Sequence, residues 1–230
     1  MERIRERVRA VRERIAAAAA RAGRDPGGVT LVAVSKAFPA EAIRAAAAAG
    51  ITDIGENRVQ EAIPKIEAIG PAVRWHLVGH LQTNKAMKAV RHFAWIQSLD
   101  SLRLAEALQK AAEAAGREAV PVLVEVNLGE EAGKTGVREA DLLPLLRALA
   151  ASPRVRVEGL MAIPPFLEDP EGVRPAFARL RTLAEKARAE ALPHVRMAHL
   201  SMGMSHDFEV AVEEGATMVR IGTAIFGPRP

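Results

Sequence analysis

The residue with the clearest chemical potential is Lys36, which ends the apolar run over residues 30–35. Runs of Val, Leu and Ala bounded by Gly and Pro predict a strand that is buried on both faces. Because side chains alternate along a strand, Val32, Val34 and Lys36 share one face. If that face lines the interior of a sheet, burial lowers the pKa of the Lys36 amine and yields a neutral nucleophile that forms Schiff bases with aldehydes. The alternative is a strand-end lysine that extends into water.

A second group of residues near the C-terminus has the composition of a phosphate-binding loop. The segment 200–207 runs from an expected strand into an expected helix, and Gly222 with Thr223 ends the next strand. Small residues and free backbone N–H groups at such ends bind phosphate in barrels of parallel strands. Ser205 and Asp207 are explained equally well as helix N-caps, and the two interpretations are compatible.

Arg220 shares a strand face with Gly222, so it points toward the same site or into the sheet interior. It either pairs with an interior carboxylate or faces a ring nitrogen or phosphate of a ligand. A lysine on one strand and a phosphate cradle on others imply a ligand with an aldehyde at one end and a phosphate at the other. Pyridoxal 5′-phosphate (PLP) meets both requirements.

The elements that must position these residues alternate between strand and helix. After an amphipathic helix over 2–22, strands are expected over 29–36, 51–57, 74–79, 93–99, 120–128, 155–162, 198–201 and 217–226. The intervening helices are expected over 40–49, 58–69, 83–91, 101–115, 138–151, 171–191 and 206–214. This pattern predicts an α/β fold, a single closed (β/α)8 barrel with an extra N-terminal helix; a doubly wound open sheet is the alternative. We expect one domain over residues 1–230.

Composition excludes several classes of function. The formal net charge is +4 with alternating signs, and aromatic residues make up 3% of the chain, so nucleic-acid binding is not expected. The sequence holds no run of about 18 apolar residues, which argues against a membrane span. It has no cysteine, and its six histidines lack metal-site spacing, so we expect no metal and a cytoplasmic protein.

Two further loops are candidates for covering the site. The segment 79–85 is polar and contains His80, and the segment 129–136 is rich in glycine and contains Lys134. The first is equally explained as an ordinary capped loop and the second as a surface loop without a chemical role.

At this point the chain resembles a known family. The segments 32–36, 55–57, 75–85, 200–205 and 219–227 together closely resemble the pyridoxal-phosphate homeostasis proteins. The likeness spans essentially the whole chain. That family is similar to the N-terminal barrel of alanine racemase, a fold-type III PLP protein.

The resemblance implies that Lys36 holds PLP as a Schiff base and that seven further residues contact the cofactor. Ser201 and the backbone at Gly222 and Thr223 would bind the phosphate, with Gly203 or Ser205 assisting. Arg220 would approach the pyridine nitrogen, and Asn57 would lie at the 3′-hydroxyl side or the ring face.

The resemblance also bears on catalysis. A cation beside the ring nitrogen disfavours its protonation, which makes the ring a poorer electron sink. Alanine racemase takes its second base, a tyrosine, from the C-terminal domain of a partner subunit. This sequence has no tyrosine, and we expect no such domain. We therefore expect no enzyme but a PLP carrier that buffers the cofactor and passes it to PLP-dependent apoenzymes.

Two alternatives stay open. One is a weak amino-acid racemase or lyase that uses Lys36 with a histidine such as His80. The other is a barrel isomerase or aldolase that binds a sugar phosphate through the same cradle. A monomer is the expected state, with a dimer as the alternative.

Overall fold

Eight parallel strands close into a barrel in the part of the chain that the computed structural model describes, residues 2–129 and 135–228. The strand order is β4-β3-β2-β1-β9-β8-β7-β5, and β5 pairs with β4 to complete the ring. The bounds are β1 Thr30–Val34, β2 Asp53–Glu56, β3 Arg74–Leu77, β4 Trp95–Leu99, β5 Val120–Asn127, β7 Val155–Met161, β8 Val195–Ser201 and β9 Met218–Ile221. A short strand, β6 (Val137–Arg138), pairs with β5 outside the ring. The predicted (β/α)8 barrel is confirmed.

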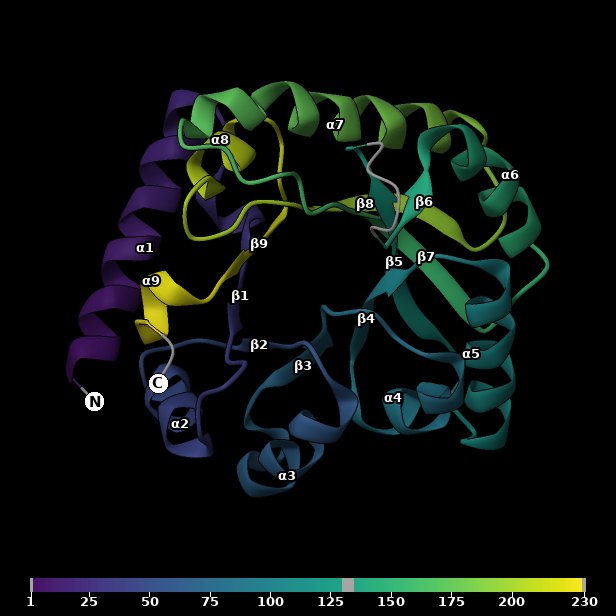
Figure 1. Cartoon of the computed structure of the whole chain (residues 1–230), viewed down its shortest axis with the longest axis horizontal. Helices are drawn as coiled ribbons and strands as arrows, with labels where there is room; N and C mark the ends of the chain where they lie inside the picture. The colour runs from purple at the N-terminus through teal and green to yellow at the C-terminus, as the bar shows by residue number, and fades with distance from the viewer. Residues whose placement is uncertain (1, 130–134, 229–230) are drawn as a thin grey trace.

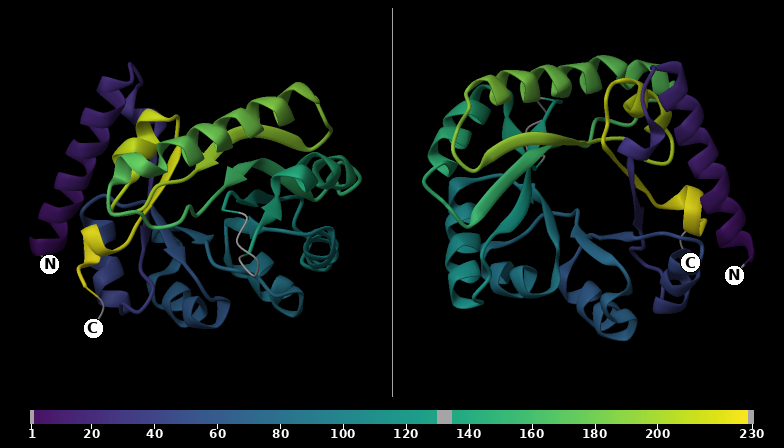
Figure 2. Two further views of the ribbon diagram at one scale, coloured as in Figure 1. Left: turned by 45° about the horizontal axis from the view of Figure 1, so that its top comes forward. Right: turned by 180° about the vertical axis from the view of Figure 1, so that it is seen from behind.

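Helices surround the strands on the outside of the barrel (Figures 1 and 2). They are α1 Glu2–Arg21, α2 Ala40–Ala48, α3 Val59–Ile69, α4 Ala86–His92, α5 Leu102–Ala114, α6 Glu139–Leu149, α7 Arg174–Ala189, α8 Phe208–Glu213 and α9 Thr223–Phe226. None of the described helices has the length and apolar composition needed to cross a bilayer.

Alternating strand side chains divide the core into two parts. On β1, Leu31 and Ala33 face outward and join the apolar layer beneath the helices, as predicted from the period of two. Inside the barrel, Leu123, Met161 and Met218 form a separate small cluster. Polar residues fill much of the remaining interior, and they prove important for the site.

The two largest differences from the predicted strand boundaries lie in the last two strands of the barrel. The eighth strand was expected to continue to residue 226, but it ends at Ile221, and residues 223–226 form α9. The apolar residues of this segment do not extend the sheet, and the Phe226 ring stacks on Phe38, in the loop after β1, at 5.2 Å between centroids. The strand expected at 198–201 begins earlier, at Val195. The centre of the expected loop over 129–136 lies outside the described residues.

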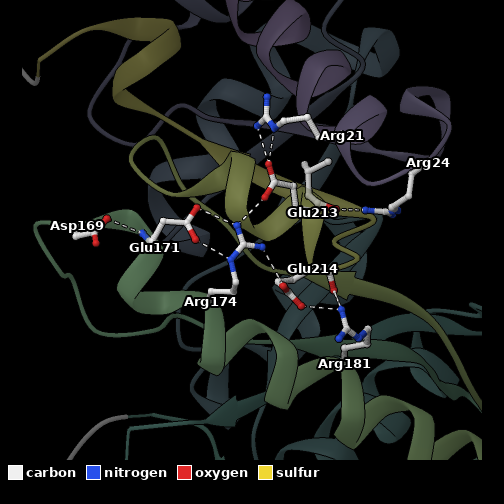
Figure 3. Close-up of polar contacts among 9 residues, drawn as sticks. Arg21, Arg24, Asp169, Glu171, Arg174, Arg181, Glu213 and Glu214 are labelled. Carbon is white, nitrogen blue, oxygen red and sulfur yellow. Dashed lines mark hydrogen bonds and ion pairs between the residues drawn. The ribbon is translucent and has the colours of Figure 1, made fainter.

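An ionic network joins the N-terminal helix to the C-terminal part of the barrel (Figure 3). Arg174 on α7 bonds to Glu213 at 2.6 Å and to Glu214 at 3.0 Å. Arg21 on α1 reaches Glu213 at 2.7 Å, and Arg181 reaches Glu214 at 2.7 Å. The two adjacent carboxylates at the end of α8 therefore connect three helices.

Candidate functional site

A cavity of about 430 Å³ opens at the C-terminal ends of the strands, where barrels of this type carry their functional sites. Its lining combines a few apolar side chains with a larger number of polar and charged ones. The lining residues are Val34, Lys36, Asn57, Val78, Gly79, His80, Glu125, Thr135, Ile163, Met204, Ser205, His206, Arg220, Gly222 and Thr223.

The structure brings together six of the eight residues that the sequence indicates. Lys36, Asn57, Ser205, Arg220, Gly222 and Thr223 all line the cavity. Ser201 and Gly203 lie outside this lining and behind it, in buried positions.

The backbone that carries Lys36 is held from behind by a partly buried ion pair between Lys65 and Glu56. Lys65 donates to Glu56 Oε1 at 2.7 Å and to the Ser35 carbonyl at 3.1 Å, and the Ser35 hydroxyl donates to the same Glu56 oxygen at 2.5 Å. Ala37, directly after Lys36, adopts a φ of 66°, a conformation that alanine rarely takes. Such outliers persist where surrounding structure fixes the backbone. The strand end therefore presents Lys36 from a well-determined position.

Arg220 is buried beneath the cavity and contributes its positive charge there. Its Nη1 donates to Ser201 Oγ at 2.7 Å and its Nη2 donates to the Ala162 carbonyl at 2.8 Å. Burial lowers the pKa of Arg220 to about 10, while the charges of Glu125 and Asp207 act in the opposite direction. The guanidinium thus stays charged at neutral pH. Ser201, which the family resemblance implies binds the phosphate, accepts this hydrogen bond and so holds the arginine; its contact with a ligand stays a prediction.

The loop between β8 and α8 forms one rim of the cavity. Its turn is closed by the Asp207 carboxylate, which accepts the Met204 N–H at 2.6 Å. Asp207 stands at the N-cap position of α8, but its side chain makes no capping bond to that helix, so the predicted capping role is wrong. The Ser205 hydroxyl accepts the Ala224 N–H at 3.2 Å and connects this rim to the segment after β9. Hydroxyl groups and turn backbone therefore meet on one side of the cavity.

A close backbone approach places Asn57 in the opposite wall. A Cβ atom at Gly79 would lie 2.3 Å from the Asn57 carbonyl oxygen, so the loop after β3 reaches β2 only because residue 79 is glycine. The Ser98 hydroxyl donates to the Gly79 carbonyl at 2.7 Å and fixes this contact.

Glu125 is the most informative residue that the sequence interpretation missed. It lies on β5. In the closed ring, three strands lie between β5 and β1 in either direction: β4, β3 and β2 one way, and β7, β8 and β9 the other. Glu125 therefore stands across the barrel from the strand that precedes Lys36. Burial raises the pKa of Glu125, although Thr135 donates a 2.6 Å hydrogen bond to it. The available signal was an acidic residue within an otherwise apolar strand.

Two histidines complete the edge of the cavity. His80 pairs with Asp100 at 3.3 Å and is half-exposed. His206 Nε2 lies 3.0 Å from the carbonyl oxygens of Leu167 and Glu168, and its ring packs against Phe166 at 4.9 Å. The second histidine thereby fixes the loop after β7 next to the opening. No group of three or more His, Cys, Asp or Glu residues suited to a metal ion occurs among the described residues.

The donor set fits a phosphorylated aromatic aldehyde. The cavity brings together a primary amine, a buried guanidinium and two hydroxyl groups next to a glycine backbone. An amine captures an aldehyde, a fixed cation can face a ring nitrogen, and hydroxyl and backbone N–H groups bind phosphate oxygens. PLP carries each of these complementary groups.

Comparison with known proteins assigns the class of barrel. Residues 7–230 match the family model described as "Alanine racemase, N-terminal domain". The alanine racemase of Corynebacterium glutamicum superposes with a TM-score of 0.78 at 20% identity, over 99% of this chain and 61% of that one. This second likeness is one of fold.

Closer relatives narrow the family. The pyridoxal phosphate homeostasis protein of Aquifex aeolicus is 47% identical over 97% of each chain. The structure of PipY from Synechococcus elongatus, described with PLP bound, superposes with a TM-score of 0.85 at 42% identity and covers 97% of this chain and all of that one (100%). The chain belongs to the pyridoxal phosphate homeostasis protein family.

Proposed function

We propose that this protein binds PLP in the cavity at the C-terminal ends of its strands and acts in the homeostasis of that cofactor. The observation that carries the proposal is that Lys36 and Arg220 open into one cavity from β1 and β9, which are neighbouring strands. The names of its relatives, and the PLP described in the structure of PipY, point to the same ligand.

Each residue then has a defined role. Lys36 attaches to the aldehyde of PLP as a Schiff base, with the release of one water molecule. Arg220 faces the ring nitrogen and Asn57 the ring or its 3′-hydroxyl. Ser205, Thr223 and the Gly222 backbone hold the phosphate. Ser201 and Gly203 support them from behind.

The protein is proposed to store and deliver PLP without turnover. A cation at the ring nitrogen weakens the ring as an electron sink, which suits a carrier better than an enzyme of carbanion chemistry. The recipients would be PLP-dependent apoenzymes that take up the released aldehyde.

A weak racemase or lyase activity is the second candidate, and one observation favours it. His80 and Glu125 line the cavity together with Lys36, so groups able to move a proton are present near a bound substrate. Loss of α-deuterium from labelled L-alanine at rates typical of enzymes would support this function over storage.

Borohydride reduction followed by peptide mapping tests PLP capture directly. We expect the label on the peptide that contains Lys36, and its loss, together with the visible absorbance of the Schiff base, in Lys36→Ala. Lys88→Ala, at an exposed position of α4, is the matched control and should behave like the wild type. Delivery is tested by mixing the loaded protein with an apoenzyme and measuring regained activity. Cofactor that stays on the carrier would contradict delivery, and capture unaffected by Lys36→Ala would contradict the site.

A further inference from the structure

A chain of buried polar side chains runs from Arg220 into the interior of the barrel. Ser201 Oγ, which accepts the Arg220 bond, donates to Gln97 Oε1 at 2.7 Å. Gln97 Nε2 lies 3.0 Å from His76 Nδ1, and His76 Nε2 lies 2.8 Å from Asp53 Oδ1. Ser201, Gln97, His76 and Asp53 are each at most 1% exposed. This hydrogen-bonded chain thus takes one side chain from each of five strands, in the order β9, β8, β4, β3 and β2.

With Gln97 Oε1 facing Ser201, the chemistry of these groups sets the direction of every hydrogen bond. A guanidinium only donates, so the Ser201 oxygen accepts and its proton points to the Gln97 carbonyl oxygen. The amide NH₂ of Gln97 must then face His76, whose Nδ1 accepts. The imidazole proton therefore lies on Nε2 and is donated to Asp53. The chain as built requires a neutral His76 with one defined tautomer.

The surroundings of His76 and Asp53 favour that state. Burial lowers the pKa of His76, although Asp53 acts in the opposite direction. Burial by itself raises the pKa of Asp53, but hydrogen bonds from His76, Arg74 and Thr52 outweigh this and hold it well below its usual range. The Trp95 ring stacks parallel to the His76 ring with a centroid distance of 5.9 Å.

We propose that Gln97, His76 and Asp53 are positioning residues for the Arg220 guanidinium and, through it, for the ring of the bound cofactor. If His76 carried protons on both nitrogens, the Gln97 amide would have to turn, and Ser201 would lose the acceptor of its proton. The hydroxyl would then be free to rotate and would no longer hold Arg220 in one orientation. This inference rests on the proposed function, because it concerns the same site.

Substitutions at Gln97 test the chain. In Gln97→Leu the Ser201 hydroxyl loses its acceptor, and we expect PLP affinity to fall about ten-fold, the effect of one buried hydrogen bond, together with a shifted absorption band. Met161→Leu replaces an apolar interior side chain, packed against Leu123 and Met218, by one of similar volume and removes none of the hydrogen bonds named above, so its affinity should stay within about two-fold of the wild type.

Gln97→Glu is the conservative variant that should restore binding. A carboxylate at position 97 can accept hydrogen bonds from both Ser201 and a doubly protonated His76. The hydrogen-bonded chain then keeps its contacts, but His76 must gain a second proton. We expect affinity within about three-fold of the wild type at pH 7, since Arg220 keeps its partner, and a decline as pH rises and that proton is lost. The other ionisable groups around His76 are Asp53, Arg74 and His199, the last of which packs on the Trp95 ring.

A measurement without PLP makes the inference independent of whether Gln97→Leu folds. The ¹⁵N shifts of His76 in the cofactor-free wild type should show the neutral Nε2–H tautomer, and those in Gln97→Glu the imidazolium. A wild-type His76 protonated on Nδ1, or unchanged PLP affinity and absorbance in Gln97→Leu, overturns the inference. A wild-type protein that fails to capture PLP overturns the proposed function instead, so the two failures are distinguishable.

Discussion

The Gly203 carbonyl accepts a 2.9 Å hydrogen bond from the Arg220 amide and so joins the loop after β8 to the strand that carries the buried guanidinium. Gly203 has a φ of +93°, and a Cβ atom there would lie 2.6 Å from Ala211 Cβ and 3.0 Å from Phe208 Cα. Glycine is therefore needed at position 203, both for the backbone conformation and because a side chain would not fit. Through its carbonyl hydrogen bond, Gly203 supports the backbone of Arg220.

Gly203→Ala should consequently weaken both stability and binding. We expect a loss of about 2–3 kcal/mol in the free energy of unfolding, from combined backbone strain and overpacking. PLP affinity should fall as well, because the Arg220 backbone shifts. Urea unfolding and a PLP titration provide the measurements. Gly28→Ala is the control, since that glycine is exposed with no atom within 4 Å of an added Cβ. Equal effects at the two positions would contradict this role for Gly203.

Asp53→Asn should destabilise the protein in a pH-dependent manner. The pKa of Asp53 is held below its usual range in the folded state, so its stabilisation is present above the unfolded pKa of about 3.9 and is lost as pH falls through the folded value. We expect a cost of about 2 kcal/mol at pH 7, since His76 and Arg74 lose a charged acceptor, and a smaller cost at pH 3. Asp141→Asn, which removes one exposed surface partner of Arg138, should cost less than about 0.5 kcal/mol at either pH.

Glu125→Gln should have the opposite pH dependence. Because burial raises the pKa of Glu125, its contribution is fully present below the unfolded pKa and is lost as pH rises through the folded value. As pH rises, the free energy of unfolding of the variant should therefore increase relative to that of the wild type. The increase is about 1.4 kcal/mol for each unit between the folded and unfolded pKa values of Glu125. Thermal unfolding across pH 5 to 8 measures this difference, with the exposed Glu118→Gln as a control. A constant difference across that range would show that Glu125 is not held in its acid form.

Arg174→Met should loosen the contact between α7 and the end of α8 (Figure 3). Hydrogen bonds to Glu171, Glu213 and Glu214 raise the pKa of Arg174, and its side chain is one-third exposed. Since it joins three carboxylates, we expect a loss of about 1 kcal/mol that shrinks in high salt. Arg179 lies on α7 like Arg174 but forms a single ion pair among the described residues, with Glu139 of α6. Arg179→Met should therefore lower the free energy of unfolding by less than about 0.5 kcal/mol. Urea unfolding at low and high salt compares the two, and equal losses would mean that the network adds nothing beyond one pair.

Much of the fold followed from local patterns in the sequence. The period of two over residues 30–36 assigned Lys36 to the inner face of its strand, and repeated strand-helix units indicated the barrel. Such patterns are local, because a strand's faces and its ends depend on neighbours a few residues away. The same logic located Asn57 and Gly222 at strand ends.

Only the tertiary structure decided which of these residues face each other. Ring closure between β4 and β5 sets Glu125 across from the strand of Lys36 and brings Gln97 of β4 within reach of Ser201 of β8. No local pattern encodes these pairs, because they depend on the register and curvature of all eight strands together. The sequence determined which side chains point into the barrel, and the closure of the barrel determined which of them touch.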